Sequence, residues 1–128
     1  MVENREEAMT YAELFYEIKN RFMEADVSDL KEHLAFQFNI EDEDAGGIFY
    51  VEVKDGVLAV EPYEYYDRHA MFTASPEVFL KIADGKMDPI WAFTSQKLKV
   101  EGDLDKALRL KEIIDSKKKQ AKLDKKKK

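Results

Sequence analysis

Residues 84–110 read DGKMDPIWAFTSQKLKVEGDLDKALRL and contain two helix starts and one strand. Asp88 followed by Pro89 is typical of a helix start, because the Asp side chain accepts a hydrogen bond from a free amide of the first turn and Pro has no amide hydrogen to leave unpaired. A short helix is therefore predicted from Pro89 to Ser95. Apolar and charged residues then alternate over 97–101, which predicts a strand with one buried face. Gly102 ends that strand, and Asp103 can cap the next helix.

The preceding residues predict two amphipathic helices and four strands. Apolar residues at helical spacing favour a helix over 11–23, started by a capping box at Thr10 to Glu13, and a second helix that begins at Pro76 and stops at Gly85. Period-two alternation predicts strands over 34–40, 48–54, 57–60 and 69–74, and Asp55-Gly56 predicts a hairpin turn. Leu104, Ala107, Leu108 and Ile114 predict one last amphipathic helix.

Several segments within residues 84–110 together resemble the signature of the sterol carrier protein type two family, also called nonspecific lipid-transfer proteins. These segments are Gly85-Lys86-Met87-Asp88-Pro89, Ala92-Phe93, Lys97-Leu98-Lys99-Val100-Glu101-Gly102-Asp103-Leu104 and Ala107-Leu108-Arg109-Leu110. Agreement over about 25 residues is far more specific than a short motif. The resemblance implies an α+β fold in which a mixed five-stranded sheet, covered by about five helices, encloses an apolar cavity for a fatty acid, acyl-CoA or sterol. Some relatives carry a polar Gln near Leu108, so an apolar Leu there disfavours a polar head-group contact.

Ten apolar residues form the candidate lipid-binding cavity that the resemblance implies. They are Phe36, Phe38, Phe79, Ile82, Met87, Ile90, Trp91, Phe93, Leu104 and Leu108. The same residues could form a filled core, which is the simpler interpretation for an arbitrary sequence. The resemblance favours a cavity in which an apolar ligand gains about 0.8 kcal/mol for each methylene removed from water.

Composition limits the classes of protein and partner. A chain of 128 residues with 45% hydrophobic residues fits one globular domain, predicted here as residues 1–116. With no Cys, no run of apolar residues long enough to span a membrane and a polar N-terminus, we expect a cytoplasmic protein.

The net charge is unevenly distributed. Residues Lys117–Lys128 hold eight Lys and one Asp, or +7, so a chain of net charge −6 leaves −13 on residues 1–116. That acidic body disfavours nucleic acid as a partner. The lysine-rich segment 117–128 is predicted to be a disordered, solubilising tail. The alternative is that Lys117–Lys128 makes transient contact with an anionic membrane, at about 1 kcal/mol per Lys before screening.

Catalytic motifs are not recognisable. Neither a nucleophile elbow nor a Gly-rich phosphate loop occurs, and His33 and His69 have no metal-type ligands near them in sequence. Residues 41–52 match a calcium loop only in part, because Ala45 stands at a ligand position. We expect no enzyme activity, no metal and no cofactor.

The sequence therefore predicts non-catalytic binding and transfer of an apolar lipid such as a fatty acid, acyl-CoA or sterol-like molecule. The alternative is an accessory or dimerisation domain of a lipid-metabolising enzyme, in which case a homodimer is expected.

Overall fold

The computed structural model of the protein describes residues 9–116. Its helices are α2 (Tyr11–Phe22), α3 (Pro76–Ala83), α4 (Pro89–Thr94) and α5 (Leu104–Ala107), and residues 110–116 are also helical. Its strands are β1 (Leu34–Ile40), β2 (Gly47–Lys54), β3 (Val57–Glu61), β4 (Ala70–Ala74) and β5 (Lys99–Gly102). The predicted lysine-rich tail, 117–128, lies outside the described residues.

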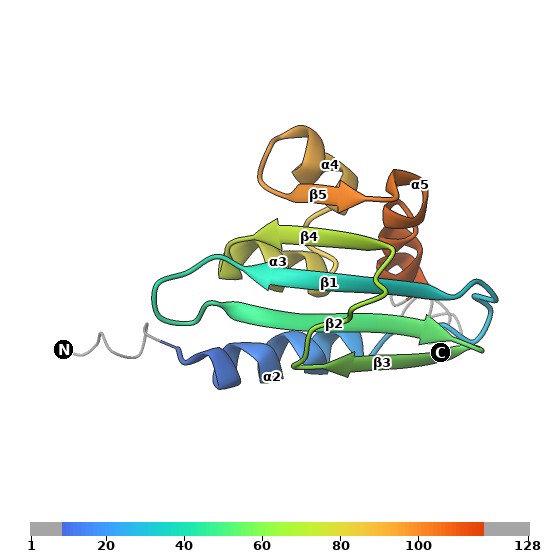
Figure 1. Cartoon of the computed structure of the whole chain (residues 1–128), viewed down its shortest axis with the longest axis horizontal. Coiled ribbons are helices and arrows are strands. Elements are labelled where there is room, and N and C mark those ends of the chain that lie inside the picture. The colour runs from blue at the N-terminus through green and yellow to red at the C-terminus, as the bar shows by residue number, and fades with distance from the viewer. Residues whose placement is uncertain (1–8, 117–128) are drawn as a thin grey trace, which may run out of the picture.

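The five strands form one mixed sheet in the order β3-β2-β1-β4-β5 (Figure 1). Strand β1 pairs in parallel with β4, and the other three pairings are antiparallel. The predicted α+β fold with a mixed five-stranded sheet is therefore confirmed.

One face of the sheet carries the core. Alternate residues of β1 point to that face, and their partners on β2 and β4 are also apolar: Phe38 lies opposite Phe49 on one side and Phe72 on the other. The Phe38 ring stacks on Phe49 with centroids 4.8 Å apart and also contacts the rings of Phe72, Phe79 and Phe22. This cluster is fully buried, so it fixes the centre of the domain.

Helices α2 and α3 cover this face (Figure 1). The predicted capping box starts α2: Thr10 Oγ1 accepts from the Glu13 amide, and Glu13 accepts from the Thr10 amide. Helix α2 buries Leu14, Ile18 and Phe22, and α3 buries Phe79, Ile82 and Ala83. An ion pair of 2.8 Å between Arg21 and Asp84 joins the ends of the two helices.

The connection from β3 to β4, residues 62–69, crosses the opposite face of the sheet (Figure 1). Tyr65 fastens it: its amide donates to the buried Gln37, and its hydroxyl donates to Glu52 at 2.7 Å. This bond to Glu52 raises the pKa of Tyr65 to about 12. Burial raises the pKa of Glu52, but hydrogen bonds from Tyr65 and His33 outweigh it, and the net shift is downward. The polar network thus holds the crossover against the sheet.

The last predicted helix is interrupted, which corrects the sequence interpretation. Helix α5 ends at Ala107, and residues 108–109 form a turn before helical residues 110–116. The Arg109 amide bonds to the Lys106 carbonyl and the Lys111 amide to the Leu108 carbonyl, so the backbone is wound more tightly there than in an α-helix. Leu108 is exposed, whereas Leu110, Ile113 and Ile114 are buried.

Candidate ligand-binding pocket

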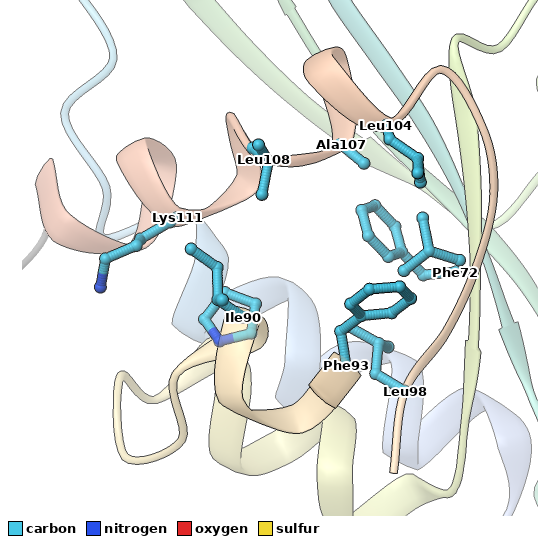
Figure 2. Close-up of a pocket in the computed structure, with 10 residues that line it drawn as sticks. Phe72, Ile90, Phe93, Leu98, Leu104, Ala107, Leu108 and Lys111 are labelled. Carbon is cyan, nitrogen blue, oxygen red and sulfur yellow. The ribbon is translucent and has the colours of Figure 1, made fainter. Parts of the chain in front are cut away.

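An apolar pocket of about 260 Å³ lies between helix α4, helix α5 and the β4–β5 edge of the sheet. Figure 2 shows α4 on one side, α5 and the residues after it on the other, and labelled apolar side chains pointing between them, while the amino end of Lys111 lies at the margin. Ten residues line it: Phe72, Pro89, Ile90, Phe93, Leu98, Val100, Leu104, Ala107, Leu108 and Lys111. Nine are apolar, so the volume suits a hydrocarbon ligand.

The floor of the pocket comes from the sheet and its approach. Phe72 on β4 pairs with Val100 on β5, and Leu98 immediately precedes β5. Phe72 and Leu98 are each about 2% exposed, so this end of the pocket is shielded from water. A floor of this kind offers no hydrogen bond to a ligand.

Helix α4 forms one wall, and its start follows the predicted Asp88-Pro89 pattern. The Asp88 carboxylate accepts from the Ile90 amide at 3.1 Å, and Pro89 occupies the first turn. Pro89 and Ala92 face inward and are buried. Ile90 and Phe93 then extend along the pocket, each more than a third exposed, so the wall borders an opening to solvent.

Helix α5 forms the opposite wall. Asp103 caps it by accepting from the Lys106 amide at 3.1 Å, and the Asp103 amide bonds to the His69 carbonyl at 2.9 Å. Gly102, just before the cap, has a φ of 106°, and a Cβ there would lie 2.7 Å from the His69 carbonyl oxygen. Only glycine fits this close approach, which places Leu104 and Ala107 over the pocket.

Lys106 and Arg109 attach this wall to the rest of the domain. Their side chains bind the Glu32 carboxylate at 2.7 Å and 3.2 Å. The hydrogen bond from Lys106 lowers the pKa of Glu32. Beside it, burial lowers the pKa of His69, whose Nδ1 accepts from the Ala35 amide. These polar groups lie outside the pocket lining and serve to position α5.

Four of the ten residues predicted from sequence line this pocket: Ile90, Phe93, Leu104 and Leu108. Four others are fully buried in the core against the sheet: Phe36, Phe38, Phe79 and Ile82. Met87 is partly buried and packs against that core, while Trp91 is 51% exposed and outside the lining. The structure therefore divides nine of the ten residues between a filled core and the pocket, and leaves Trp91 on the surface.

Six lining residues were not identified from sequence: Phe72, Pro89, Leu98, Val100, Ala107 and Lys111. The alternation of Leu98 and Val100 in the predicted strand was the available signal for two of them, because it placed both on the buried face. Lys111 gave no such signal, because it counts as a charged residue in a sequence pattern although its methylene stem can line an apolar surface.

Within residues 9–116, no group of three His, Asp or Glu side chains is arranged to hold a metal ion. Across the same residues, no helix has the length and hydropathy needed to cross a membrane. The predictions about activity and cofactors stay predictions.

The family model for the SCP-2 sterol transfer family matches residues 12–115. The chain belongs to the SCP-2 sterol transfer family. Among SCP-2 relatives of known structure, palmitated SCP2L2 from Aedes aegypti is 25% identical, with a TM-score of 0.59 over 83% of this chain and 95% of that one. Sterol carrier protein 2 from Yarrowia lipolytica, in its apo form, is 21% identical with a TM-score of 0.51 over 80% and 74% of the two chains, a likeness of fold.

The curated relatives include much longer proteins. Hydroxysteroid dehydrogenase-like protein 2 of Rattus norvegicus is 32% identical over 80 residues, which cover 62% of this chain and 15% of the relative. The protein of the same name from Xenopus tropicalis is 34% identical over 82 residues, 62% of this chain and 19% of the relative. The chain thus spans less than a fifth of the length of these relatives.

Proposed function

We propose that this SCP-2 domain binds an apolar lipid in the pocket between α4 and α5 and transfers it without a covalent step. The observation that carries the proposal is the pocket lining, in which nine of ten side chains are apolar. A fatty acid, an acyl-CoA or a sterol-like molecule fits this chemistry, and each methylene that leaves water contributes about 0.8 kcal/mol.

The size of the pocket limits how much of a ligand it encloses. Its volume of about 260 Å³ lies slightly below the range of about 300–1,000 Å³ typical of small-molecule sites. Leu104 and Leu108 at its rim are 53% and 54% exposed. We infer that one hydrocarbon segment enters between the walls and that a longer ligand extends past these two leucines.

Native mass spectrometry of gently purified protein tests this function. We expect adducts in the mass range of fatty acids or sterols that disappear after solvent extraction. The competing proposal is an accessory or dimerisation domain, which is favoured by the much greater length of the dehydrogenase-like relatives. A clean mass without ligand, together with a homodimer, would support that alternative.

The cytoplasmic location is also a proposal, and the absence of Cys fits a reducing compartment.

Trp91 provides a fluorescent probe of binding, because the sequence has one Trp and it lies between the pocket residue Ile90 and Ala92 on α4. We expect a fluorescent fatty acid to quench or shift its emission, and Trp91→Phe to remove the signal while preserving the fold. Trp91 is half exposed, so this variant gives up little core packing. Emission unchanged at saturating ligand would contradict the prediction that Trp91 lies at the cavity or its mouth.

The segment Lys117–Lys128 is proposed to assist lipid exchange by transient contact with anionic membranes. Its charge of +7 attracts an anionic membrane, whereas the charge of −13 on residues 1–116 repels it. Salt should weaken the attraction, because charges are screened beyond a Debye length of about 8–10 Å. We expect the full chain to sediment with anionic vesicles at low salt and to be released at high salt. A chain ending at Ser116 is the comparison, and equal sedimentation of both chains at low salt would rule out a membrane role for the segment.

A further inference from the structure

One end of the pocket is charged. Lys111 is the only charged side chain among the described residues that line it. Figure 2 shows Lys111 with Ile90 and Leu108 at one end of the pocket, away from Phe72 and Leu98 at the other. A ligand whose hydrocarbon end lies on the buried floor therefore has its other end near Lys111.

The Lys111 ammonium already has two carboxylate partners. Its Nζ lies 3.5 Å from Oδ1 of Asp88 and 3.7 Å from Oδ2 of Asp115. Asp88 belongs to the start of the α4 wall and Lys111 to the opposite wall, so this ion pair joins the two sides of the opening. Two negative charges thus face one positive charge at this end.

The surrounding sequence supplies no surplus of positive charge. Residues 84–116 contain six Lys or Arg and seven Asp or Glu, a net charge of −1. Residues 1–83 contain seven Lys or Arg and nineteen Asp or Glu, a net charge of −12. The field of the domain therefore opposes an anionic group at the pocket and does not oppose a neutral one.

We propose that Lys111, Asp88 and Asp115, here called the charge gate, select lipids with an uncharged end, such as an alcohol, over the carboxylate of the same chain length. This inference rests on the proposed function of the pocket. A carboxylate reaching Lys111 adds a third negative charge beside Asp88 and Asp115, which already share this ammonium. A hydroxyl can accept from Lys111 and donate to either Asp without changing the charge balance.

Calorimetry on the full chain tests the charge gate by measuring the dissociation constants of dodecanol and dodecanoate. The titrations are made at about pH 8, where the acid is ionised. We expect the wild type to bind dodecanol more tightly. Asp88→Asn should lower the ratio of the dodecanoate constant to the dodecanol constant by about two- to fivefold, the range expected for an exposed ion pair. The cap of α4 survives this change because Asn caps as well as Asp. Lys111→Met, which keeps the apolar stem, should raise this ratio by a similar factor.

Glu77→Gln and Lys81→Met are the matched controls. They make the same charge changes in an exposed ion pair of 3.2 Å on α3, whose residues do not line this pocket. Neither control should alter the ratio of the two constants, and Asp115→Asn should act in the same direction as Asp88→Asn. Because Lys117–Lys128 is identical in all variants, its contribution cancels when the ratios are compared.

Two results would overturn the charge gate while leaving lipid binding intact: tighter binding of dodecanoate than dodecanol by the wild type, or an unchanged ratio in both Asp variants. If the wild type binds neither probe, the proposed binding of a hydrocarbon chain in this pocket is wrong. The two failures are therefore distinguishable in one set of titrations.

Discussion

Phe38→Ala is expected to lower the free energy of unfolding by about 3–5 kcal/mol. Phe38 is fully buried on β1, the central strand, and its ring contacts the rings of Phe22, Phe49, Phe72 and Phe79. The substitution removes apolar burial and leaves a cavity that four packed rings, held by both helices and strands, cannot easily close.

Urea unfolding followed by circular dichroism measures this loss. Tyr16→Ala is the matched control, because it removes an aromatic side chain that is 63% exposed on α2, and a change within about 0.5 kcal/mol is expected. Phe38→Leu should fall between the two. A loss below about 1 kcal/mol for Phe38→Ala would show that this cluster is not the centre of the core.

Ala107→Phe is expected to abolish or greatly weaken lipid binding. Ala107 is buried on α5 and points into the pocket between its walls (Figure 2). A phenyl ring added there occupies the volume that the ligand would fill. Exclusion of only two methylenes costs about 1.6 kcal/mol, or more than tenfold in affinity.

Ala12→Phe makes the same substitution at an exposed position of α2 and should leave the affinity unchanged. Thermal unfolding of both variants is needed as well, because overpacking can itself destabilise a fold by about 1–3 kcal/mol. A stable Ala107→Phe variant with wild-type affinity would show that ligands bind elsewhere.

Periodicity predicted the sheet well because each strand has one strongly apolar face. The predicted bounds of the first strand, 34–40, agree with β1, and the other predicted strands differ from those observed by one or two residues at their ends. The capping residues Thr10, Ser75, Asp88 and Asp103 were also identifiable, since a cap depends on local chemistry alone.

The pocket was less predictable, because periodicity tells which face of a strand is buried but not what covers it. Phe38 and Phe72 lie opposite each other on the same face of the sheet. Helix packing buries Phe38 in the core, whereas Phe72 extends to the pocket floor.

The parallel pairing of β1 with β4 has a consequence for the order of folding. Strands β1, β2 and β3 join through short connections, whereas the contact between Ala35 and His69 closes a separation of 34 residues. Loop closure of this length costs entropy before any contact compensates for it, so the meander of β1 to β3 should form early and β4 and β5 should dock later. The pocket depends on the later elements. A bound lipid would accordingly slow the opening of that half of the molecule much more than the opening of the meander.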